Sequence, residues 1–184
     1  MRRCECVTLR AKEKRLAGIP LKFRDATFEN YEPRSPDQMR TRCAMMDQPQ
    51  GSYLLHGRYG AGKTHLLYSQ YRVLVLRGHL CHVRTTEELL QEIQREEFER
   101  DFVSPVLDAV RTQRRYHLFW DDCSEYKPTD FKFQGLYYLV DTIYKRQLRL
   151  TATSSLTLLR LGEEEKLPQS VIRRLDDMCQ VLEV

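Results

Sequence analysis

The sequence predicts an α/β protein in which helices cover both faces of a parallel, five-stranded sheet. Segments with the pattern of short buried strands alternate with helical segments along most of the 184 residues. A glycine-rich loop at residues 57–64 and a pair of carboxylates, Asp121 and Asp122, each directly follow a predicted strand. Ligands bind at that end of the strands in such sheets, so the two features predict one site.

Composition is that of a globular protein, with 41% hydrophobic and 30% charged residues. No apolar run approaches the eighteen or so residues of a membrane span, and the N-terminus lacks an apolar signal region. Six cysteines are scattered along the chain, which favours reduced thiols over a disulfide framework. We therefore expect a cytoplasmic protein.

Residues 1–34 are predicted to form a basic helix and a linker, followed by the main domain at residues 35–184. Helix formers and charges fill residues 5–17, and Gly18-Ile19-Pro20 ends that run. Residues 1–24 carry a net charge of +6, whereas the whole chain carries +4. A basic arm of this kind suits nucleic acid or an acidic partner, although it is equally typical of a solvated helix face.

The first half of the main domain supplies two predicted strands and three helices. Ser35 and Pro36 mark a helix start, and that helix should run to about Asp47. A short strand at 52–56 leads into the glycine-rich loop, and a helix at 63–77 follows, with Gly78 in the position of a C-terminal cap. The next strand is "LCHVRT", and the helical segment after it opens with a capping signal at Thr85.

The second half continues the alternation. We expect helices at 104–113, 129–146 and 168–178, and strands at 116–122, 148–155 and 179–184. The strand at 116–122, "YHLFWDD", is apolar until it ends in the two carboxylates.

The glycine-rich loop fits the phosphate-binding pattern G-x-x-x-x-G-K-[ST] at every fixed position. Its backbone N–H groups can surround the β-phosphate of ATP, while Lys63 reaches the β- and γ-phosphates and Thr64 binds Mg²⁺. The expected nucleotide-binding residues of this segment are Gly57, Arg58, Tyr59, Gly60, Ala61, Gly62, Lys63, Thr64 and His65.

The acidic pair predicts hydrolysis. Asp121 is expected to hold Mg²⁺ through water, and Asp122 to orient and deprotonate the attacking water. A second acid directly after the first is typical of ATPases with an additional strand between the phosphate-loop strand and the acidic strand. Sequence does not fix the strand order.

Four segments together resemble the bacterial DnaC/DnaI helicase-loader and IstB group of AAA+ ATPases: "AGIPLKFRDATFENY", "GRYGAGKTHLL", "FWDD" and "SVIRRLDDMCQVLEV". The resemblance extends from about Arg10 onward. It implies a three-layer αβα P-loop core without a C-terminal helical lid. It also implies that Phe28 and Tyr31 lie near the adenine, although packing of the linker against the core would explain both aromatics equally well.

The same resemblance assigns two further catalytic residues. Ser154 takes the place of the family's polar sensor, usually Asn, and Thr153 is the alternative. Arg174 takes the place of the arginine finger that acts on a neighbouring subunit, with Arg173 as the alternative. The expected catalytic set is therefore Lys63, Asp122, Ser154 and Arg174.

The resemblance also implies partners. These are the replicative DNA helicase or a transposase, single- or double-stranded DNA, and further copies of the chain in a helical or ring oligomer. Cys4 and Cys6 match the end of a zinc module and could hold zinc only with ligands from outside this chain. The candidate DNA contacts are Arg111, Arg114, Arg115, Lys127, Lys132, Lys145 and Arg146, with Tyr126, Phe131 and Phe133 for stacking.

The expected function is that of an ATP-driven factor that loads or remodels the replicative helicase on DNA. Three alternatives stay open at this stage. They are an IstB-like helper of transposition, a small P-loop kinase, and a nucleotide-binding regulator that no longer hydrolyses ATP.

Overall fold

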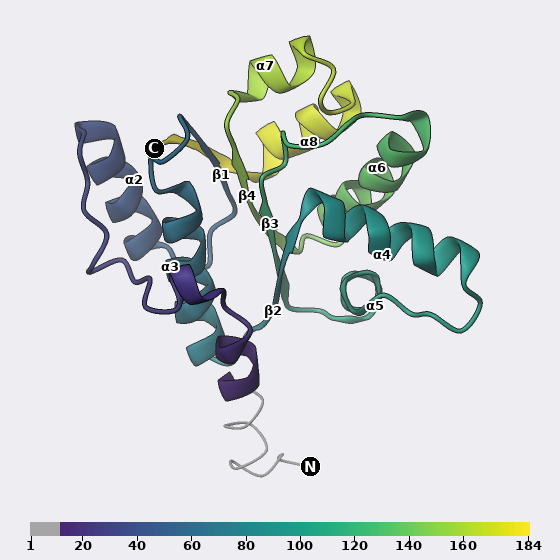
Figure 1. The fold of residues 1–184 in the computed structure, drawn as a ribbon, viewed down its shortest axis with the longest axis horizontal. Coiled ribbons are helices and arrows are strands. Elements are labelled where there is room, and N and C mark those ends of the chain that lie inside the picture. The colour runs from purple at the N-terminus through teal and green to yellow at the C-terminus, as the bar shows by residue number, and fades with distance from the viewer. Residues whose placement is uncertain (1–11) are drawn as a thin grey trace.

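Five parallel strands form one sheet in the order β2-β3-β4-β1-β5 (Figure 1). The computed structural model describes residues 12–184. The strands are β1 (Tyr53–His56), β2 (Leu80–Thr85), β3 (Tyr116–Asp121), β4 (Arg149–Ser154) and β5 (Gln180–Glu183). The predicted parallel five-stranded sheet is confirmed, and β4 is the additional strand between the phosphate-loop strand and the acidic strand.

Two layers of helices cover the sheet. One face carries α2 (Pro36–Asp47) and α3 (Lys63–Leu76), and the other carries α4 (Thr86–Phe98), α5 (Pro105–Thr112), α6 (Asp130–Lys145) and α8 (Gln169–Met178) (Figure 1). Side chains alternate along each strand to serve the two layers. On β1, Leu54 joins the cluster under α4, α5, α6 and α8, while Tyr53 and Leu55 join the cluster under α2 and α3.

Side-chain caps begin most of the helices. Ser35, Thr85, Ser104 and Thr129 each accept a hydrogen bond from a backbone N–H of the first turn, and Thr85 completes a capping box with Glu88. These caps explain why the predicted helix starts hold. The prediction lacked η1 (Leu21–Phe23) and α7 (Leu158–Glu163), because three to six residues are too few to display a helical period.

The N-terminal segment packs onto α3 and the start of β2. Residues 12–17 are helical, and Lys12 donates to the Leu76 carbonyl at 2.7 Å. Ile19 and Ala26 are buried against α3. The zinc prediction for Cys4 and Cys6 lies outside the described residues.

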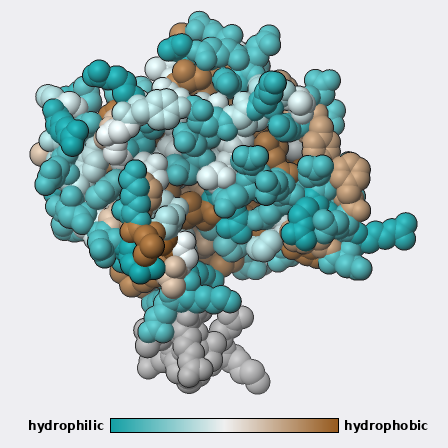
Figure 2. Space-filling view, viewed as in Figure 1, coloured by the Kyte–Doolittle hydropathy of each residue, from teal (hydrophilic) through white to brown (hydrophobic). Residues whose placement is uncertain are grey.

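The surface seen in Figure 2 is mainly hydrophilic, with small hydrophobic areas between the hydrophilic residues. No helix within residues 12–184 has the length and apolarity that crossing a membrane requires.

Candidate nucleotide-binding site

The glycine-rich loop joins β1 to α3 at the edge of the sheet where the strands end. Gly62 has φ 99° at the N-cap of α3, and a Cβ there would lie 2.5 Å from the Tyr31 ring. A Cβ on Gly57 would lie 2.1 Å from the Val184 carbonyl oxygen. Both positions therefore require glycine, which lets the loop turn tightly and present its N–H groups to a phosphate.

Lys63 lies inside the loop and is almost fully buried. Its ammonium group donates to the carbonyls of Gly57 at 2.8 Å and Arg58 at 3.0 Å. Burial lowers the pKa of this lysine, while Asp122 and Asp121 act in the opposite direction. The ammonium group is held at the centre of the loop, where the negative charges of both aspartates act on it.

Asp121 is tied to the loop and to the neighbouring strand. Its carboxylate accepts from the Thr64 hydroxyl at 3.2 Å and from the Thr153 hydroxyl at 2.6 Å. Thr64 and Asp121 supply the hard oxygen ligands that Mg²⁺ prefers, and this ion keeps several waters in such sites. The two residues predicted to hold magnesium are therefore neighbours, and their chemistry fits the ion.

Asp122 turns the chain away from the strand with φ 60°, a left-handed value that is uncommon outside glycine. Its N–H donates to the Thr153 hydroxyl at 2.9 Å, and its carbonyl accepts from Thr86 at 2.8 Å. Burial, Asp121 and Glu125 raise the pKa of Asp122. A raised pKa suits a general base for water.

Thr153, rather than Ser154, contacts the acidic pair. Alternation along β4 turns Thr153 toward α3, whereas the fully buried Ser154 hydroxyl accepts from the Leu156 N–H at 2.9 Å. Ser155, which sequence reasoning missed, donates to Glu125 at 3.3 Å, and Glu125 also accepts from the exposed Tyr59. Its position could have identified it, because Ser155 directly follows β4 at the end of the sheet where ligands bind.

The segment 27–31 is fastened to the loop. Tyr31 donates to the Ala61 carbonyl at 3.0 Å, and Nε2 of His65 lies 2.9 Å from the Thr27 carbonyl oxygen. Phe28 is buried with Leu55 and Leu66, in the cluster that also holds Tyr31. Its role beside adenine stays a prediction.

A cavity of about 650 Å³ adjoins the loop, a volume typical of small-ligand sites. The loop itself lines it from Gly57 to Ala61, together with Glu183 at the end of β5 and Val184 after it. Gln38 of α2 also lines it and donates to the Ala61 carbonyl at 3.3 Å. No sequence pattern marks Gln38 as a site residue, because a single glutamine on a helix belongs to no recognised motif.

Arg174 lies on α8, away from this cavity. Its guanidinium donates to Asp141 of α6 at 2.5 Å and to the Ser170 carbonyl at 2.8 Å, and it lies 4.8 Å from the Tyr137 ring centre. Arg173, the alternative finger, is exposed on the same helix. An arginine finger acts on a neighbouring subunit, so its assignment stays a prediction.

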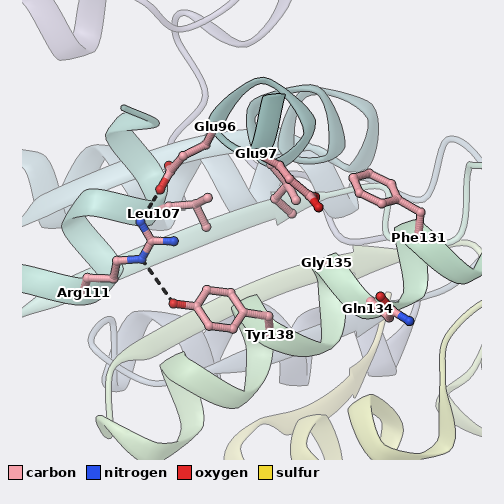
Figure 3. Close-up of a pocket in the computed structure, with 9 residues that line it drawn as sticks. Glu96, Glu97, Leu107, Arg111, Phe131, Gln134, Gly135 and Tyr138 are labelled. Carbon is pink, nitrogen blue, oxygen red and sulfur yellow. Dashed lines mark hydrogen bonds and ion pairs between the residues drawn. The ribbon is translucent and has the colours of Figure 1, made fainter. Parts of the chain in front are cut away.

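Four of the candidate DNA contacts lie in two separate places. A cavity of about 300 Å³ between α4, α5 and α6 is lined by Phe131 and Arg111, and Arg111 bridges Glu96 and Tyr138 there (Figure 3). Arg114 and Arg115 lie elsewhere, at the edge of the sheet where the strands begin.

Most of the remaining candidates contact their own chain. Lys145 pairs with Asp141, Arg146 donates to the backbone of residues 111 and 113, Lys132 donates to the Lys127 carbonyl, and Tyr126 donates to the Lys166 carbonyl.

Neither a protein-family model nor a curated protein matches the sequence. Solved structures match the fold. The DnaC helicase loader superposes with a TM-score of 0.76 at 17% identity, over 90% of this chain and 99% of that one. DnaI superposes with a TM-score of 0.73 at 17% identity, over 90% and 94%.

AMPPCP-bound DnaA from Aquifex aeolicus superposes with a TM-score of 0.73 at 14% identity, over 91% of this chain and 51% of that one. The chain therefore has the three-layer αβα P-loop fold of these structures. The resemblance to the DnaC/DnaI group is confirmed at the level of the fold.

Proposed function

We propose that this chain is an ATP-hydrolysing, oligomerising AAA+ factor of DNA replication that loads or remodels the replicative helicase on DNA. The observation that supports it most is the Thr64–Asp121–Thr153 contact, which joins the phosphate loop, the acidic strand and the additional strand. The likeness to DnaC, a helicase loader, and to DnaA bound to AMPPCP and single-stranded DNA supports the replication role.

The residues divide the work of hydrolysis. Loop N–H groups bind the β-phosphate, and Lys63 exchanges its contacts with two loop carbonyls for contacts with phosphate oxygens. Asp122 takes a proton from the attacking water as its oxygen bonds to the γ-phosphorus and ADP leaves. Thr64 and Asp121 would hold Mg²⁺, which neutralises charge on the phosphates.

Arg174 completes the site of a neighbouring subunit in this proposal. To do so it exchanges the Asp141 carboxylate for a phosphate, because both anions accept hydrogen bonds from the N–H groups of the guanidinium. Equal mixtures of Arg174→Ala and Lys63→Ala subunits should regain part of the activity that each variant lacks. No recovery from two folded variants would contradict a site shared between subunits.

The hydrolysis test compares Asp122→Asn with Asp101→Asn, an exposed aspartate outside the site. Phosphate release should fall by at least about a hundredfold in Asp122→Asn alone, because a general base contributes 10²–10⁴-fold. Nucleotide binding should persist in Asp122→Asn and disappear in Lys63→Ala. Equal rates in the two aspartate variants would refute the assignment of the base.

The partner test is capture of the host's replicative helicase by the full-length chain in the presence of ATP and magnesium. Retention of the helicase by wild type but not by Lys63→Ala is expected. Capture of a transposase instead of the helicase would favour the transposition helper.

A further inference from the structure

A second polar cavity, of about 390 Å³, lies at the edge of the sheet where the strands begin. It is formed by the residues before β2 and at the starts of β3 and β4. Its polar lining includes Gln50, His79, Arg114, Arg115, Gln147 and Arg149. Because the strands are parallel, this edge is opposite the phosphate loop.

Positive charge is concentrated there without nearby compensation. No carboxylate among residues 12–184 lines the cavity. Arg114, Arg115 and Arg149 are exposed, and within the described chain none of the three takes part in an ion pair. An adjoining cavity of about 400 Å³ shares Arg149 and adds Arg77, with Asp47 as its one acid.

Helix ends explain only part of this charge. α3, α5 and α6 end at this edge, and cations there balance the negative end of each helix. Arg77, Arg111 and Lys145 already occupy those positions. Arg114, Arg115 and Arg149 lie beyond the helices, in the turn before β3 and at the first position of β4.

Two imidazoles line the cavity, the half-buried His79 and the buried His117, and the arginines act on both. Burial lowers the pKa of His79, and Arg115 and Arg77 lower it further. Burial, with Arg149 adding to it, lowers the pKa of His117 to about 3. Each of the arginines Arg77, Arg115 and Arg149 therefore acts on one of the two imidazoles that line the cavity.

We infer that Arg114, Arg115 and Arg149 bind the phosphodiester backbone of a nucleic acid. A guanidinium group can donate two parallel hydrogen bonds to the oxygens of one phosphate. Exposed arginines from separate chain segments suit an extended polyanion better than one enclosed small anion. Arg146 supports the arrangement, because it donates to the carbonyls of Arg111 and Gln113 and so anchors the backbone just before Arg114. The inference rests on the DNA-handling part of the proposed function and is independent of ATP.

The test measures binding of a short fluorescent DNA by anisotropy, with single and double strands, between about 50 and 200 mM salt. The variant replaces Arg114, Arg115 and Arg149 with Gln. The control replaces Lys22, Arg100 and Arg160 with Gln, which removes the same charge from exposed positions elsewhere. Circular dichroism and nucleotide binding establish that each variant is folded.

Affinity for single strands should fall at least about tenfold in the first variant, and its salt slope should fall by about 2, because each lost phosphate contact removes about 0.7. The control should stay within about threefold of wild type. A variant with Lys at the three positions should keep most of the slope, since charge is retained.

Four results would overturn the inference: wild type that binds no DNA, a first variant that binds as wild type does, a control that loses as much, or competition by polyglutamate as effective as competition by DNA. A thermal shift with inorganic phosphate but no DNA binding would reassign the edge to a free anion. Loss of DNA binding in the first variant, in a protein that hydrolyses no ATP, would uphold this inference while the proposed function fails.

Discussion

Thr153→Val replaces a hydroxyl by a methyl group of the same shape in the fully buried bridge between β4 and the acidic pair. The hydroxyl donates to Asp121 at 2.6 Å and accepts from the Asp122 N–H at 2.9 Å. An unpaired buried N–H costs about 1–3 kcal/mol, and a hydrogen bond to a charged group contributes about 1.5–3 kcal/mol. Asp121 is half-buried and regains water, so we expect a net loss of about 2 kcal/mol.

A loss of that size lowers the melting temperature by about 4–8 °C in a chain of this length. Urea unfolding gives the free energy, and phosphate release gives the effect on hydrolysis, which should fall at least tenfold as Asp122 loses its anchor. Thr153→Ser keeps the hydroxyl and should retain hydrolysis while losing only about 1 kcal/mol for the methyl group. If Thr153→Val is as stable and as active as Thr153→Ser, the bridge does not position the acids.

Three further predictions concern single groups. Because the pKa of Asp122 is raised in the folded protein, its carboxyl group favours folding most when it is protonated, and this contribution is lost as pH rises through that pKa. Asp122→Asn should therefore be more stable than wild type in urea at pH 7. The difference in the free energy of unfolding should close below about pH 4. Gly62→Ala should lower the free energy of unfolding by at least about 1 kcal/mol more than Gly60→Ala. A Cβ at position 62 meets the Tyr31 ring, whereas a Cβ at position 60 has nothing within 4 Å. Equal losses in the two variants would contradict this. Burial lowers the pKa of His117 to about 3, so this histidine binds a proton in the unfolded state before it does in the folded state. The free energy of unfolding of wild type should therefore fall as pH drops from about 6.5 toward 3. Urea titrations at each pH should show a smaller fall for His117→Gln.

Sequence reasoning succeeded where local chemistry decides the structure. Caps such as Ser35 and Thr129 bind their own first turns, so the helix starts are visible without tertiary information. The phosphate loop and Asp121 were placed by their position after apolar strands, and the structure brings Thr64 and Asp121 together.

Local sequence does not decide contacts that depend on alternation along a strand or on distant parts of the chain. Ser154 was aligned with a family sensor, but which of two adjacent hydroxyls reaches Asp121 depends on the face of β4 that each one occupies. Gln38 contacts the loop from α2, and Ser155 contacts Glu125, which also accepts from Tyr59 of the loop. The Arg174–Asp141 pair joins residues of two helices that are 33 positions apart in sequence. None of these contacts has a local pattern.

Strand β3 begins at the arginine-lined cavity and ends at Asp121, a span of six residues or roughly 17–20 Å. Both of its edges are hydrogen-bonded and every residue before Asp121 is buried, so it behaves as a stiff rod in a poorly compressible interior. A shift of the acidic pair when nucleotide changes would therefore displace the opposite end as well. The acidic pair and the arginine-lined cavity are thus joined by one rigid element and would move together.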